Sequence, residues 1–76
     1  MPHVVVKLYA GRSEQQKKKL AEEITKAVMT TLSAGEESVS VAIEDVEPND
    51  WTEKVYRPDI LGKSDTIYKK PGYNPL

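Results

Sequence analysis

The sequence predicts an α+β fold built on a single β-α-β unit. Three observations predict it: a β-branched, apolar run at 3–9, an amphipathic run at 13–33, and an alternating run at 38–46. Two strands joined through one helix are expected to run parallel, with a right-handed crossover. The C-terminal third is expected to add short helical turns and irregular chain. One domain is expected to span residues 1–76.

The first strand is predicted over residues 3–9, with the sequence HVVVKLY. Three successive valines are typical of a strand that is covered on both faces. Alternation assigns the side chains to two faces, with Pro2, Val4, Val6 and Leu8 on one and His3, Val5, Lys7 and Tyr9 on the other.

The helix is predicted over residues 13–33. Gly11 interrupts the strand, and Ser13 with Gln16 matches a capping box at the helix start. Gly35 is expected to cap the end of the helix. The helix is predicted to carry one apolar stripe, formed by Leu20, Ala21, Ile24, Ala27, Val28, Thr31 and Leu32.

The second strand is predicted over residues 38–46, where small and apolar residues alternate. Asn49 or Asp50 is expected to cap a short helix that begins near Trp51. Pro58 is expected to hold Arg57 in an extended conformation and to leave residues 57–63 irregular. Residues 64–68 are expected to form another helical turn.

Size and composition exclude several classes of protein. A 76-residue chain has a marginal core, and without cysteine it has no disulfide to stabilise it. One histidine and no cysteine predict no metal site, and no cofactor is expected. A net charge of −1 argues against nucleic acid. No membrane-spanning run or signal peptide is recognisable, so a soluble, cytoplasmic protein is expected.

One β-α-β unit leaves the sheet with exposed edges and one bare face, which predicts a homo-oligomer. Two units paired edge to edge would form a four-stranded sheet with two helices on one side. The C-terminal third or further subunits would then cover the other face. The sequence thus predicts a dimer or a larger symmetric assembly.

Pro2 is the first candidate for chemistry. Proline lacks an N–H and is tolerated at the start of a strand, so a purely structural role is one interpretation. Alternatively, removal of Met1 would leave Pro2 with a free secondary amine. Such an amine titrates near about 7.7–8.0 in small peptides, and an apolar pocket or a nearby arginine lowers that pKa. The amine would then be a competent general base.

Arg12 is the second candidate. It lies between the first strand and the helix, where a cation opposes the helix dipole and adds no local stability. A solvated arginine is the simpler interpretation. Its planar guanidinium could alternatively bind a carboxylate.

The run PHVVVKLYAGRSEQQK resembles the start of the 4-oxalocrotonate tautomerase family, and ESVSVAIEDV is similar to that family's second strand. The C-terminal Trp51, with KKPGY at 69–73, is similar to the longer, PptA-type branch. The resemblance covers essentially the whole chain. It implies that Pro2 is the general base, that Arg12 binds a substrate carboxylate, often from a neighbouring subunit, and that Trp51 forms a wall of the pocket.

One position departs from the family. Hexameric members carry a second arginine on the second strand, where this chain has Ser40. The departure disfavours dicarboxylates and favours a small monocarboxylate with an apolar or aromatic group, such as an α-keto acid. Ser40 could still donate one neutral hydrogen bond to the substrate, although a plain strand residue is the simpler interpretation. This departure, together with the C-terminal extension, favours the family's dimeric branch, with a hexamer as the alternative. His3 is expected to have a structural or solvent-exposed role.

The leading functional hypothesis is a cofactor-free keto–enol tautomerase acting on small α-keto acids and their enols. A second hypothesis uses the same amine for dehalogenation, hydration or decarboxylation. A third is a non-catalytic assembly or ligand-binding module in which Met1 is retained and Pro2 has no basicity.

Overall fold

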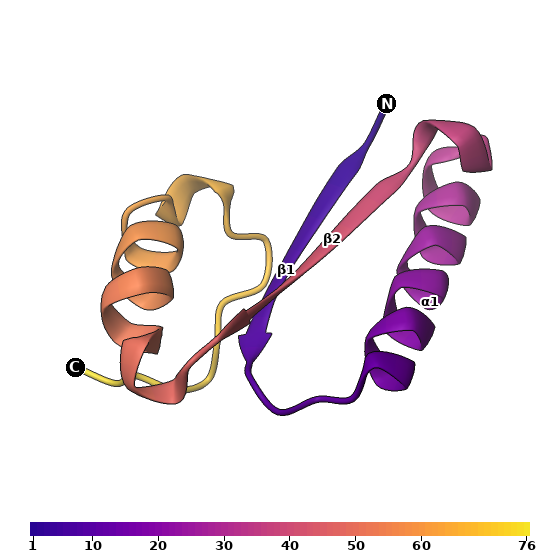
Figure 1. Cartoon of the computed structure of the whole chain (residues 1–76). Helices are drawn as coiled ribbons and strands as arrows, with labels where there is room; N and C mark the ends of the chain where they lie inside the picture. The colour runs from indigo at the N-terminus through magenta and orange to yellow at the C-terminus, as the bar shows by residue number, and fades with distance from the viewer.

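The computed structural model describes all residues, 1–76. Strand β1 (His3–Tyr9) leads through helix α1 (Glu14–Leu32) to strand β2 (Ser40–Val46), and the chain then continues as a C-terminal segment, residues 47–76. The two strands form one parallel sheet, as predicted. Helix α1 lies on one side of the strands and the C-terminal segment on the other (Figure 1). No helix is long and apolar enough to cross a membrane.

The register of the sheet fixes which side chains share a face. His3 pairs with Ser40, and Tyr9 at the other end pairs with Val46. The α1 side is marked by an ion pair between Lys17 of α1 and Asp45 of β2, 2.5 Å apart. Its β1 and β2 residues are Val4, Val6, Leu8, Val41, Ile43 and Asp45.

Helix α1 begins as predicted and ends earlier than predicted. The Ser13 hydroxyl accepts a hydrogen bond from the Gln16 N–H, and the Gln16 side chain accepts one from the Ser13 N–H, both at 3.0 Å. The predicted Gly35 cap is wrong. Ser33 instead caps the helix in the left-handed region, with φ 55° and ψ 38°, whereas Gly35 is extended and precedes a 3₁₀ turn at Glu36–Ser38. This turn also delays the second strand from 38 to 40.

Replacing Ser33 with glycine is expected to stabilise the chain by about 0.5–1 kcal/mol, because glycine adopts the left-handed conformation without a steric penalty. Chemical denaturation at a fixed protein concentration measures the free energy of unfolding. The control is Ala27→Gly within α1, expected to destabilise by about 1 kcal/mol. A loss of stability in both variants would contradict this account of the helix end.

The C-terminal segment is more helical than predicted. A π-helix at Thr52–Leu61 runs through Arg57 and Pro58, so the extended conformation predicted for Arg57 is wrong. In an α-helix the Pro58 ring would press on the carbonyl four residues back, and the wider π turn relieves this contact. The Gly62 N–H donates to the Arg57 carbonyl five residues back, at 2.8 Å. A Cβ at Gly62 would lie 2.6 Å from the Pro58 carbonyl oxygen, so only glycine fits.

The start of this π-helix also differs from the prediction. Trp51 precedes it and no side chain caps it, since Asp50 forms an ion pair with Lys54 at 3.3 Å instead. The predicted helical turn near residues 64–68 is present as a 3₁₀ turn at Ser64–Thr66.

The C-terminal segment packs against part of the sheet face opposite α1. Asp59 binds Lys7 of β1 at 2.5 Å, and Trp51 packs edge-on against Tyr9, with ring centroids 5.1 Å apart. The hydrogen bond that Lys7 donates to Asp59 raises the pKa of Lys7, so Lys7 stays protonated at neutral pH. Val55 and Tyr56, both in the π-helix, are the chain's two buried residues.

Candidate active site

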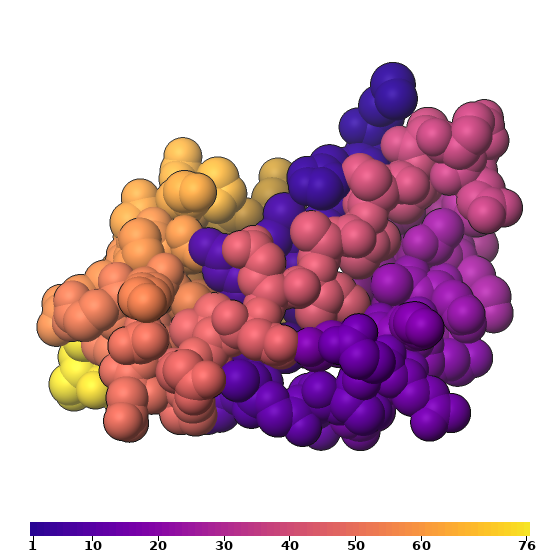
Figure 2. Space-filling model, in the orientation of Figure 1, coloured from indigo at the N-terminus to yellow at the C-terminus, as the bar shows by residue number.

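The start of the sheet holds Pro2, His3 and Ser40. The Ser40 N–H donates a hydrogen bond to the Pro2 carbonyl at 3.2 Å, which places the start of β2 beside the N-terminal end of β1. His3 Nδ1 lies 2.6 Å from Ser40 Oγ. Pro2 is half-buried and Met1 is fully exposed. The N-terminal end projects beyond the rest of the molecule in Figure 2, so this end of the sheet is open.

Arg12 lies past the opposite end of β1. Gly11, with φ 121°, turns the chain there. Arg12 comes next, in the loop between β1 and α1. The exposed Arg12 side chain borders a hollow with Leu8, Gln16, Lys17 and Leu20. The chain's eight ion pairs leave Arg12 without a carboxylate partner, whereas Arg57 is paired with Glu53 at 2.8 Å. The Arg12 guanidinium is therefore available to an external anion.

The loop that carries Arg12 is held by an ion pair. Lys17, in the first turns of α1, is 2.5 Å from Asp45 near the end of β2, and its side chain is only 16% exposed. The hydrogen bond that Lys17 donates to Asp45 raises the pKa of Lys17, so its ammonium stays charged. This contact ties the start of α1 to the carboxyl end of the sheet and so limits where Arg12 can lie.

Trp51 lies at the same end of the sheet as Arg12, on the face away from α1. Its indole N–H donates to the Tyr73 hydroxyl at 2.8 Å, and the Tyr73 ring is 5.7 Å from the Tyr56 ring. Trp51 is half-buried and contacts Tyr9. Within one chain it therefore packs the C-terminal segment onto the end of β1.

The predicted site residues thus fall into two groups at opposite ends of β1. Pro2 and Ser40 are at the start, and Arg12 and Trp51 are at the end. The seven-residue strand between them spans about 20 Å at about 3.3 Å per residue. A small carboxylate cannot contact both Pro2 and Arg12 of one chain. None of the five surface hollows is lined by Pro2.

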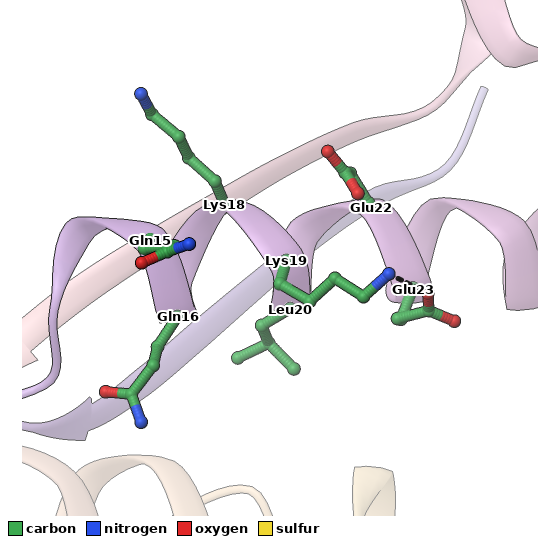
Figure 3. A pocket seen from close by; sticks show the side chains of 7 residues that line it. All are labelled: Gln15, Gln16, Lys18, Lys19, Leu20, Glu22 and Glu23. Atoms are coloured by element: carbon green, nitrogen blue, oxygen red, sulfur yellow. Dashed lines mark ion pairs between the residues drawn. The ribbon is translucent and has the colours of Figure 1, made fainter.

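A further groove lies on the outer surface of α1 (Figure 3). Lys19 and Glu23 form an ion pair there at 3.1 Å. Lys18 lies on one side of the helix, whereas Gln16 and Leu20 lie on the other, so the polar groups do not converge on one point. This groove is far from Pro2 and lacks the features of a reaction site.

Two contacts near the candidate site residues were not predicted from the sequence. Alternation placed His3 on the face opposite Pro2, but only the register shows that Ser40 lies directly beside it. The hydrogen bond between Trp51 and Tyr73 follows only from the path of the C-terminal segment. No cluster of three or more His, Cys, Asp or Glu side chains is arranged to hold a metal ion.

Comparison with known proteins identifies the family. The model of the tautomerase enzyme family matches residues 2–55, so the match begins at Pro2. The chain belongs to the tautomerase family. A protein of Xylella fastidiosa (strain 9a5c) named "Probable tautomerase" is 42% identical over 76 residues, covering 100% of this chain and 93% of the relative. Tautomerase PptA of Cronobacter sakazakii (strain ATCC BAA-894) is 39% identical, with 96% and 97% covered.

Solved structures of the tautomerase family agree with this assignment. A 4-oxalocrotonate tautomerase isozyme from Methylibium petroleiphilum superposes with a TM-score of 0.64 at 38% identity, covering 66% of this chain and 81% of the other. The resemblance to the 4-oxalocrotonate tautomerase family and its PptA-type branch is confirmed. This tautomerase chain is therefore an enzyme, an isomerase, and the non-catalytic alternative is not supported.

Proposed function

We propose that the enzyme interconverts the enol and keto forms of small α-keto acids, with the Pro2 amine as its base once Met1 is removed. The observation that carries this proposal is the unpaired Arg12 at one end of β1 and the open Pro2 at the other. A carboxylate held in front of Pro2 by the Arg12 of a second copy of the chain would present an adjacent enol to the amine. Met1 is fully exposed and so accessible to an aminopeptidase.

The reaction requires one base and one anion-binding group. The Pro2 nitrogen removes the enol O–H proton, the oxygen forms a carbonyl, and the electrons of the carbon–carbon double bond take up a proton at carbon from the Pro2 ammonium. Pro2 therefore returns to its neutral form after each turnover. The guanidinium of Arg12 keeps the carboxylate in place throughout, which supplies orientation.

We propose that this site forms between two copies of the chain. The isolated chain exposes 5876 Å², about 1,200 Å² more than a compact protein of its mass would expose. A standard interface covers about 800 Å² on each partner, so the excess suffices for one. Antiparallel pairing of two copies about a twofold axis would bring the start of β1 beside the end of the partner's β1. Pro2 would then lie near the partner's Arg12.

A dimer is favoured over a hexamer because the C-terminal segment already occupies part of one face of the sheet, through the contacts of Lys7 with Asp59 and of Tyr9 with Trp51. That face consequently offers less surface to further subunits. The edges of the sheet and the α1 side remain for pairing, and they carry half-exposed apolar side chains such as Leu20.

The substrate range tests the proposed function. The site has one arginine, and Ser40 stands where a second would be. A second substrate carboxylate would therefore be buried without a partner, which is costly. We expect kcat/KM for the enol of an aryl-substituted α-keto monocarboxylate to exceed that for an unsaturated dicarboxylate by about 10-fold or more. Ketonisation is followed by ultraviolet absorbance. A preference for the dicarboxylate, or turnover of halo-acrylates in place of enols, would contradict the proposal.

A further inference from the structure

Beside Pro2, two side chains from neighbouring strands form a hydrogen bond that the proposed mechanism does not use. His3 Nδ1 lies 2.6 Å from Ser40 Oγ, and the two residues are direct partners in the sheet register. Both side chains are exposed in the isolated chain. The Ser40 N–H also donates to the Pro2 carbonyl at 3.2 Å, so the pair lies one residue from the base.

The orientation of the Ser40 hydroxyl depends on which atom of this pair donates. A hydroxyl has one hydrogen to donate and two lone pairs to accept with. If the Nδ1–H of His3 donates to Ser40 Oγ, the hydroxyl hydrogen is free to point away from the strand. Ser40 Oγ has no other hydrogen-bond partner in the chain. A substrate oxygen that gains negative charge would favour this arrangement, because consecutive hydrogen bonds strengthen one another.

We propose that the Ser40 hydroxyl, oriented by His3, donates a hydrogen bond to the substrate oxygen that changes between enol and carbonyl. His3 is then a positioning residue that acts through Ser40. This inference rests on the proposed function, since it assigns a donor within the same site. A neutral donor suits an oxygen that is protonated in one form of the substrate and uncharged in the other. It supplies the polarisation that a second arginine would otherwise supply.

The test uses two matched pairs of variants. Ser40→Thr keeps a hydroxyl and Ser40→Val removes it, and both side chains have nearly the same shape and suit a strand. We expect Ser40→Thr to remain within about 2-fold of the wild type and Ser40→Val to lose about 10-fold in kcat with little change in KM, because the bond matters most in the transition state. Equal kcat in the two variants would overturn the proposal.

At His3, Asn places an amide nitrogen where Nδ1 lies, whereas Gln places it nearer the Nε2 position. His3→Asn should therefore retain most of kcat, and His3→Gln should fall about as far as Ser40→Val, that is about 10-fold. The double variant His3→Gln/Ser40→Val should be no slower than Ser40→Val alone, because both changes remove one shared contact. The role of His3 would be overturned if the two single losses in kcat multiplied in the double variant. Equal losses in His3→Asn and His3→Gln would overturn it as well.

A measurement without substrate separates this inference from the proposed function. In nitrogen-15 NMR of the free enzyme, Ser40→Val should shift the Nδ1 resonance of His3 more than its Nε2 resonance, and Ser40→Thr should leave both in place. A wild-type enzyme inactive on α-keto acid enols would contradict the proposed function. An active wild type with an unmoved Nδ1 resonance would contradict only the pairing of His3 with Ser40.

Discussion

Replacing Pro2 with alanine is expected to lower kcat/KM for enol ketonisation by about 100-fold, the lower end of what a positioned general base contributes. Alanine still leaves a primary amine after methionine removal, so some base remains. Its backbone lacks the fixed φ of proline and the secondary nitrogen. The enol of an arylpyruvate is the substrate, and absorbance is the readout. Wild-type activity in this variant would contradict the role of Pro2.

A second variant removes the amine without changing Pro2. A residue that is placed directly before Pro2 and is not cleaved would keep the Pro2 nitrogen in an amide, which has no basicity near neutral pH. We expect a loss of about 1,000-fold or more, because the base is then absent. The same residue added after Leu76 is the matched control and should leave activity unchanged. Intact-mass measurement of each protein establishes which N-terminus is present.

Replacing Arg12 with glutamine is expected to raise KM about 10- to 100-fold, because a charge-assisted hydrogen bond contributes about 1.5–3 kcal/mol. Arg12 has no ion pair in the chain, so its loss should cost little stability. The effect should fall mainly on KM for a carboxylate substrate and should shrink for the corresponding ester, which carries no charge.

The matched control for this prediction is Arg57→Gln. Arg57 is also exposed, but it is paired with Glu53 and belongs to the C-terminal segment. We expect KM to stay within about 2-fold of the wild type, since an exposed ion pair contributes little. Equal KM increases in both variants would indicate a general loss of positive charge and would contradict carboxylate binding by Arg12.

The β-α-β unit could be predicted from the sequence because its signals are local. Strand β1 has the predicted bounds, and the capping box at Ser13 was found from two residues. The end of α1 was not predicted correctly, because a serine that caps a helix in the left-handed conformation has no sequence signature of its own. The helix through Pro58 was missed because a π turn depends on the later close approach of Gly62.

The sequence predicted which residues belong to the candidate site, but it did not predict how they are arranged in space. The resemblance assigned roles to Pro2 and Arg12, which are half-buried and exposed, respectively, in the structure. Their separation by the length of β1 is a property of the fold, because a straight strand cannot return its end to its start. The pairing of His3 with Ser40 required the strand register, which alternation within one strand does not contain.

The central claim is that each site uses Pro2 of one chain and Arg12 of its partner. Pro2→Ala and Arg12→Gln chains, with different C-terminal tags, can be co-expressed and purified through both tags as a mixed dimer. One of its two sites then has both residues intact and the other has neither, so we expect about half the wild-type kcat/KM per dimer, far above either variant alone. A mixed dimer no more active than the two variants, or no mixed dimer at all, would contradict the claim.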